Sequence, residues 1–186
     1  NIALAALIAL PAAAQEETVL ERWEEDRTQI FDGADIVLAD LNWVARALVV
    51  FADTPNDPRF KQQMDLLLAE VDRLAERDVI IIVDTDTDAM SDLRTALRPR
   101  GYMLALVSKD GQVALRKPEP WSVRELSRSI DKMPLRQQEI SEDDRFRRKQ
   151  EGNARRSFKL HNHFVHGQAV ARVYVDLFDH AFAFGP

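Results

Sequence analysis

Aspartates gather at two places in the sequence where their carboxylates could form a binding site. Asp53 and Asp57 follow one apolar run, while Asp84, Asp86 and Asp88 alternate after another. Ligands of open α/β sheets tend to bind beyond the carboxyl ends of the parallel strands, so Asp53, Asp57, Asp84 and Asp86 could form a rim that holds Ca²⁺ or Mg²⁺. The EF-hand pattern is not matched, because its glycine and closing glutamate are missing. The alternative is a solvated acidic loop in which Asp88 caps the next helix.

The four histidines of the chain all lie near its C-terminal end. His161, His163 and His166 fall within six residues, a spacing that could bind Zn²⁺ or Cu²⁺. A second, distant pair of ligands is missing, and clustered histidines without supporting groups often have no metal role. A histidine metal site is therefore one interpretation, and a metal-free tail is the other.

The net charge of the chain and its local basic residues bear on the classes of partner that it could bind. The formal net charge is −6, which argues against a general nucleic-acid binder, because such a protein needs a basic face to neutralise phosphates. A local basic patch, formed by Arg145, Arg147, Arg148, Lys149, Arg155 and Arg156, could touch lipid phosphates or an acidic surface. Such a patch is more often one solvated face of a helix.

The chain contains no cysteine. Thiol–disulfide exchange and thiol peroxidase chemistry both need a thiolate, so neither is available to these residues. Disulfide bonds are absent for the same reason, and the fold must be stabilised by packing.

Hydrophobic patterning predicts an alternation of strands and helices. Continuous or alternating apolar runs indicate strands over 47–52, 79–83, 102–107 and 113–116. Helical spacing indicates helices over 16–31, 60–74, around Met90, Leu93 and Leu97, and from Ser122 onward. Ser122 and Glu125 have the spacing of a capping box, and Asp110-Gly111 is typical of a hairpin turn.

This order of elements favours one architecture. Strand–helix–strand connections imply parallel pairing in the first half, and the hairpin adds an antiparallel pair. We therefore expect an α/β fold, a thioredoxin-like three-layer α/β/α sandwich with a mixed central sheet.

Several short motifs carry a resemblance to a known family. They are Asn42-Trp43-Val44-Ala45-Arg46, Arg77-Asp78-Val79, Lys109-Asp110-Gly111 and the segment from Ile130 to Glu139. These motifs resemble the bacterial DUF4174 family, which is itself similar to the peroxiredoxin-like repeat domains of some vertebrate secreted matrix proteins. The resemblance spans roughly residues 41–139. It implies a thioredoxin-like fold and export, and it points to no reaction.

Two arginines within these motifs are candidate binding residues. Arg46 and Arg136 carry the resemblance, together with Glu139, but they define no chemistry of their own. Arg46 has a structural alternative, in which a buried pair with a carboxylate fixes the start of its strand.

Comparison with thioredoxin explains why no reaction is implied. Thioredoxin places Cys-x-x-Cys after its first core strand, and the matching residues here are Pro55-Asn56-Asp57-Pro58, with proline at both cysteine positions. Met103 stands where thioredoxin has the cis-proline that faces its cysteines. The nucleophile, the resolving thiol and the proline turn are all missing from this chain.

The first residues indicate export. Residues 1–10 form an uncharged apolar run, and Ala12-Ala13-Ala14-Gln15 follows with the small residues that a signal peptidase reads. We expect a signal-peptide remnant over 1–14, cleaved near Ala14/Gln15, and a periplasmic or secreted protein. The run is too short to span a bilayer, which needs about 20 apolar residues. The alternative is a buried N-terminal helix.

The expected organisation is thus a signal remnant (1–14), a helical lead-in (15–40), a thioredoxin-like DUF4174 domain (41–139) and an atypical, disordered or helical extension (140–186). Three functions fit it. The first is an exported non-catalytic module that binds a periplasmic or extracellular protein or surface ligand. The second is a domain that binds Ca²⁺ or Zn²⁺ through the aspartate rim or the histidines. The third, an enzyme with carboxylate acid–base chemistry at the rim, ranks last because no other catalytic motif supports it.

Overall fold

The structure is a computed structural model that describes residues 17–153. The chain divides into two units, one ending at Lys132 and the other beginning at Met133. The signal-peptide prediction for residues 1–14 and the metal prediction for His161, His163 and His166 lie outside the described residues.

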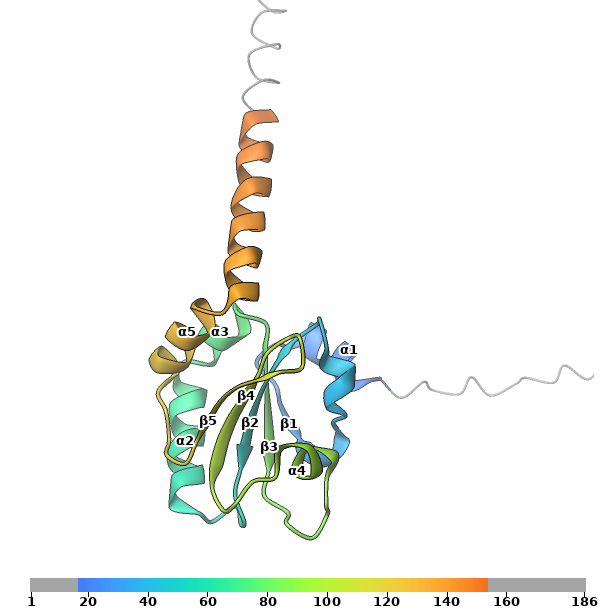
Figure 1. Ribbon diagram of the computed structural model, residues 1–186, viewed down its shortest axis with the longest axis vertical. Helices are drawn as coiled ribbons and strands as arrows, with labels where there is room; N and C mark the ends of the chain where they lie inside the picture. Colours follow the sequence, from blue (N-terminus) through green and yellow to red (C-terminus); the bar gives the residue numbers. More distant parts are fainter. Residues whose placement is uncertain (1–16, 154–186) are drawn as a thin grey trace, which may run out of the picture. The chain divides into compact units, whose positions relative to one another are not determined.

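A mixed sheet of five strands forms the centre of the first unit (Figure 1). Its strands are β1 (Ile30–Asp32), β2 (Arg46–Phe51), β3 (Val79–Asp84), β4 (Met103–Val107) and β5 (Val113–Lys117). The spatial order is β1-β3-β2-β4-β5, in which β1, β3 and β2 are parallel while β4 and β5 are antiparallel to their neighbours. β2 is buried along its whole length, as its continuous apolar run predicts.

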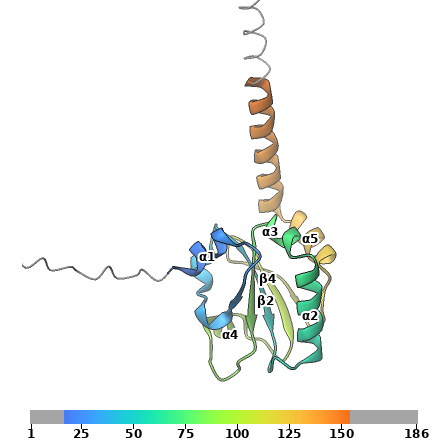
Figure 2. The same ribbon diagram turned by 180° about the vertical axis from the view of Figure 1, so that it is seen from behind.

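Helices cover both faces of this sheet. One face carries α2 (Pro58–Ala69), α3 (Val71–Ala75) and α5 (Val123–Asp131). The opposite face carries α1 (Val19–Glu25) and α4 (Asp92–Leu97) (Figures 1 and 2). The expected thioredoxin-like three-layer α/β/α sandwich with a mixed sheet is confirmed.

Side-chain caps explain where two of the helices begin. The hydroxyl of Ser122 accepts a hydrogen bond from the backbone N–H of Glu125, and the Glu125 carboxylate accepts one from the N–H of Ser122. This reciprocal pair is the predicted capping box at the start of α5. Thr18 and Glu21 make the same motif at the start of α1.

The expected helix over 16–31 is wrong in its second half. α1 ends at Glu25, and the carboxylate of Asp26 then accepts hydrogen bonds from the backbone N–H and the hydroxyl of Thr28. Such a local turn competes with helix continuation. Residues Ile30–Asp32 instead form β1, which pairs with β3 and buries Phe31.

The helix expected around Met90 begins later than the spacing suggests. α4 starts at Asp92, and Ser91 is its N-cap, since its hydroxyl accepts from the N–H of Arg94. Asp88 is therefore not the cap that the acidic-loop interpretation assigns. Met90 precedes the helix with a φ of 46° and is 71% exposed.

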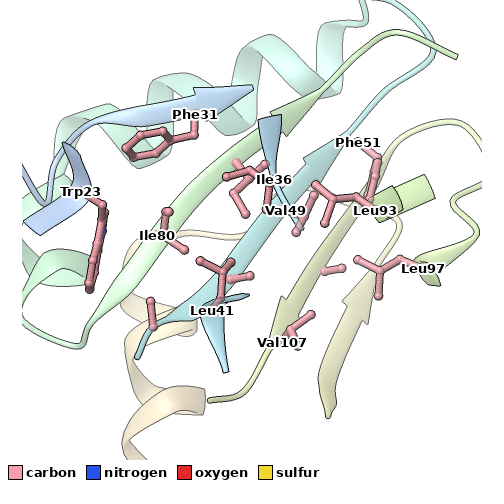
Figure 3. Close-up of a cluster of buried hydrophobic side chains, with 14 residues drawn as sticks. Trp23, Phe31, Ile36, Leu41, Val49, Phe51, Ile80, Leu93, Leu97 and Val107 are labelled. Carbon is pink, nitrogen blue, oxygen red and sulfur yellow. The ribbon is translucent and has the colours of Figure 1, made fainter. Parts of the chain in front are cut away.

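An apolar cluster fills the space between the sheet and the helices α1 and α4 (Figure 3). Val49 and Ile80 contribute from the sheet and Leu93 contributes from α4. Trp23 and Phe31 extend the cluster toward the edge of the sheet and are 1% and 3% exposed. The residues before β2 therefore belong to the core of this unit.

The described part of the second unit is a helix over 134–153. Arg136 pairs with Glu139 one turn along it, with Nη1 and Oε2 3.1 Å apart. Of the basic patch, Arg145, Arg147, Arg148 and Lys149 are exposed on this helix, while Arg155 and Arg156 lie outside the described residues. Within residues 17–153, no helix is long and apolar enough to cross a membrane.

Candidate functional site

The predicted aspartate rim lies at the carboxyl edge, the edge of the sheet where β2 and β3 end. Asp57 is the N-cap of α2, where its carboxylate accepts a hydrogen bond of 2.8 Å from the N–H of Arg59. The Arg59 guanidinium also pairs with it, at 3.2 Å. Hydrogen bonds from the side chain and backbone of Arg59 hold the pKa of Asp57 below its usual range. Asp57 thus begins a helix, as proline at the next position favours.

Asp84 forms a buried ion pair with Arg94. Its carboxylate is 2.7 Å from Nε of Arg94 and accepts a hydrogen bond from the hydroxyl of Ser91. The same guanidinium donates to the carbonyl oxygens of Ala52 and Asp84, which joins the ends of β2 and β3. Both oxygens of the Asp84 carboxylate are therefore engaged within the protein.

A close backbone approach completes this arrangement. The backbone of Gly33 packs against Asp84 so tightly that a Cβ at residue 33 would lie 2.9 Å from the Asp84 Cβ. Beside it, a hollow of about 340 Å³ is lined by Asp84 and Asp86 and by two further acids, Asp32 at the end of β1 and Asp35 just after it.

The remaining rim residues have separate surroundings. Asp86 accepts hydrogen bonds from the backbone N–H groups of Asp88 and Ala89, so it shapes its own turn. Asp53 is exposed and lies beside Gly101. Within residues 17–153, no three acidic or histidine side chains are grouped so as to hold a metal ion.

A buried hydrogen-bond network joins α2 to Tyr102, the residue before Met103, and to Trp121. Gln63 on α2 is fully buried, and its amide oxygen accepts from the hydroxyl of Tyr102 and from the N–H of Trp121. Its amide nitrogen donates to the Trp121 carbonyl. Burial raises the pKa of the Tyr102 hydroxyl, so it stays a donor. Met103 is the next residue after Tyr102, and the described chain contains no cis peptide bond.

The residues that carry the family resemblance meet at the other end of the sheet. We call this end the signature edge and define it by Trp43, Arg46, Arg77, Asp78 and Lys109. Arg46 is fully buried at the start of β2, and its guanidinium donates to the carbonyl of Arg77 at 2.8 Å. Arg77 in turn makes a two-pronged ion pair with Asp131 of α5, at 2.9 and 3.0 Å.

Asp78 links three segments at the signature edge. It has a φ of 51°, and its two carboxylate oxygens accept hydrogen bonds from Arg27, at 2.5 Å, and from Lys109, at 2.8 Å. Burial raises the pKa of Asp78, but the hydrogen bonds and charges of Lys109 and Arg27 outweigh it and leave the pKa below its usual value. The β4–β5 turn is thereby fixed to the start of β3.

Trp43 is the most exposed part of this edge. Its side chain is 71% exposed, and its backbone has a φ of 66°, a left-handed conformation that bulky residues rarely adopt. The N–H of Trp43 donates to the carbonyl of Lys109 at 2.7 Å, which holds the conformation in place. Gly111 lies so close to Asn42 that a Cβ there would be 2.9 Å from the Asn42 amide oxygen.

A comparison with protein families finds a match that covers the residues of the signature edge. The model of the family described as domain of unknown function DUF4174 matches residues 37–139. The chain belongs to the DUF4174 family. That match includes every residue of the signature edge, from Trp43 to Lys109.

A search of curated proteins finds no match. Among solved structures, StoA from Bacillus subtilis aligns at 14% identity with a TM-score of 0.32, covering 47% of this chain and 84% of StoA.

Sequence reasoning placed its aspartate candidates at the carboxyl edge, and it did not predict that Arg27, Trp43, Asp78 and Lys109 lie together in one cluster. The signal for three of them was present, because they lie within the motifs that resemble DUF4174. What was missing was the register of β2 against β3, which places Arg46 opposite Val79. Arg136, the other predicted arginine, lies in the second unit and pairs with Glu139.

Proposed function

We propose that this DUF4174 protein is an exported, non-catalytic binding module, and that a protein partner docks on the signature edge around Trp43. The observation that carries the proposal is the state of Trp43, which is both 71% exposed and left-handed at a φ of 66°. A left-handed conformation costs a non-glycine residue about 1–2 kcal/mol. Folding alone gains little from holding a large aromatic side chain this way, so the conformation points to a role outside the fold.

The surroundings of Trp43 favour a protein as the partner. Binding energy at protein interfaces is concentrated in a few residues, with tryptophan, tyrosine and arginine enriched. The neighbours Asn42 and Val44 are exposed as well, so a partner can reach the whole tip. The hydrogen bond to Lys109, itself paired with Asp78, orders the tip before binding and lowers the entropic cost of association.

The carboxyl edge supports the non-catalytic part of the proposal. A catalyst needs polar groups that are free to contact its substrate. Here the Asp84 carboxylate is engaged by Arg94 and Ser91. The Gln63 amide is engaged by Tyr102 and Trp121. The sequence holds no cysteine, which removes thiol chemistry from these residues.

Export rests on the first residues of the sequence. An uncharged apolar run followed by Ala-Ala-Ala-Gln is typical of a signal peptide and its cleavage site. We expect the mature protein, purified from the periplasm or medium of an expressing bacterium, to begin near Gln15 on N-terminal sequencing. Recovery of an uncleaved chain in the cytosol alone would contradict export.

The docking proposal is tested with the full chain and one purified partner. A photo-crosslinking amino acid at Val44 identifies the partner in the host, and its dissociation constant is then measured for Trp43→Ala and for Met90→Ala. Met90 is the matched control, since it is equally exposed, also left-handed at a φ of 46°, and lies at the carboxyl edge.

We expect Trp43→Ala to weaken binding about thirtyfold, the equivalent of ~2 kcal/mol for an aromatic anchor. Met90→Ala should leave the dissociation constant unchanged within about twofold. Equal losses in the two variants, or no loss in Trp43→Ala, would refute the docking proposal.

A further inference from the structure

A second hollow lies at the carboxyl edge, and basic residues dominate its lining. Its volume is about 450 Å³, and its lining consists of four basic residues, Arg98, Arg100, Arg116 and Lys117, together with Tyr102, Met103 and Pro118. The described residues that line it include no acid.

Local structure brings the three arginines together from different segments. Arg98 is the C-cap of α4, where a φ of 49° turns the chain away from the helix axis. Pro99 prevents the helix from continuing, and Arg100 follows in the loop to β4. Arg116 lies on the edge strand β5, directly opposite Ala105 of β4.

Strand geometry places Arg116 on the same side of the sheet as α4. Ala105 belongs to the apolar cluster that includes Leu93 and Leu97 of α4, so its side chain faces that helix. Residues directly opposite one another in an antiparallel pair share a face, and the next residue along the strand points the other way. Lys117 accordingly has its ammonium 4.1 Å from the centre of the Trp121 ring. Lys117 also lines the hollow, but its ammonium lies against the Trp121 ring, so the three arginines are the groups that would contact a bound anion.

None of Arg98, Arg100 and Arg116 pairs with a carboxylate in the described part of the chain, whereas the neighbouring Arg94 pairs with Asp84 and Arg59 pairs with Asp57. Three like charges that share a hollow repel one another, and a bound anion removes this repulsion. The concentration of positive charge is notable in a chain whose net charge is −6. The hollow therefore has the electrostatics of an anion site.

We propose that this hollow binds a phosphate group. Arginine presents a planar fork of donors that matches phosphate geometry, and a phosphate offers more acceptor oxygens to three such forks than a carboxylate does. A nucleic acid fits poorly, because a basic track along the surface would be needed to follow its backbone. The site goes beyond the proposed docking function, since it lies at the opposite edge from Trp43.

Two sources could supply the phosphate, a soluble phosphate compound and a lipid headgroup. We would titrate the full chain with inorganic phosphate by calorimetry, with sodium chloride at the same ionic strength as the reference. In a parallel arm, the chain is sedimented with phosphatidylcholine vesicles that do or do not contain phosphatidic acid. Saturable binding in the first arm alone indicates a soluble ligand, and retention that requires phosphatidic acid indicates a lipid headgroup.

Matched variants decide whether the hollow is responsible. Arg100→Gln and Arg116→Gln should each weaken binding about tenfold, because each removes a charge-assisted hydrogen bond. Arg124→Gln on α5 is the control, since Arg124 is exposed and lies outside the hollow. It should bind as the parent does, and so should Trp43→Ala. No saturable binding in either arm, or equal losses in Arg116→Gln and Arg124→Gln, would overturn the proposal.

Discussion

Replacing Trp43 by glycine should give a more stable protein than replacing it by alanine. At most positions the reverse holds, because glycine has more conformational freedom to lose on folding. Trp43 is an exception, since its φ of 66° lies in the left-handed region where every residue with a Cβ meets steric conflict. Both substitutions remove the same contacts of the partly exposed ring, so their difference isolates the backbone.

The expected magnitude follows from two opposing contributions. Alanine in the left-handed region costs about 1–2 kcal/mol, which glycine avoids. Glycine loses about 0.5–1 kcal/mol relative to alanine through the entropy of the unfolded chain. We therefore expect Trp43→Gly to exceed Trp43→Ala in unfolding free energy by about 0.5–1 kcal/mol, or a Tm difference of about 2–4 °C.

The assay is chemical and thermal unfolding of the full chain, with Val44→Gly and Val44→Ala as a matched pair. Val44 is the adjacent residue, is also exposed, and is outside the left-handed set. Its glycine variant should be the less stable of the two, by about 0.5–1 kcal/mol. If both positions rank alanine above glycine, Trp43 is not held left-handed and the reasoning that links its strain to binding is wrong.

Three further substitutions test the contacts that shape the two edges of the sheet. Arg94→Met should lower the unfolding free energy by about 3–5 kcal/mol in urea titrations, because it leaves the Asp84 charge buried without its partner; a loss under 1 kcal/mol would contradict the buried pair. Gln63→Leu should cost about 2–3 kcal/mol, since the backbone N–H and carbonyl of Trp121 lose their partners, and an unchanged urea midpoint would show that water replaces the amide. Asp78→Asn should destabilise at neutral pH, because the pKa of the Asp78 carboxyl is lower in the folded chain than in the unfolded chain. The stabilisation is present above the unfolded-chain pKa and is lost as the pH falls through the folded pKa, so the two stability–pH curves should converge in acid and not at neutral pH.

Much of the central sheet could be predicted from the sequence, because its signals are local. The residues of β2 and β3 include continuous stretches of apolar residues. Such a stretch indicates a strand that is buried on both faces. The capping box at Ser122 and Glu125 likewise needs no knowledge of the rest of the fold.

β1 could not be predicted in the same way. It is only the three residues Ile30–Asp32, too few to show alternation, and its strand character comes from pairing with Ile81–Val83. Met90 misled the helix prediction for a related reason. Its spacing to Leu93 fits a helix, but Ser91 between them caps the helix and leaves Met90 outside.

The signature edge was only partly visible in the sequence. Its residues were recognised one motif at a time, and their convergence depends on the register that sets Arg46 beside Val79 and on the turn that brings Lys109 to Asp78. Neither the exposure nor the positive φ of Trp43 has a sequence signal, because tryptophan is ordinarily a residue that folding buries. The aspartates were placed at the correct edge, but the pairing of Asp84 with Arg94 depends on how α4 packs.

The central claim is that Trp43 serves binding and not folding, and one variant tests it directly. We would measure the Tm of Trp43→Ala and, on the same preparation, its dissociation constant for the partner identified by crosslinking at Val44. The account predicts a Tm within about 2–4 °C of the parent together with binding about thirtyfold weaker. A Tm lowered as far as a core truncation would lower it, with the dissociation constant unchanged, would contradict the account.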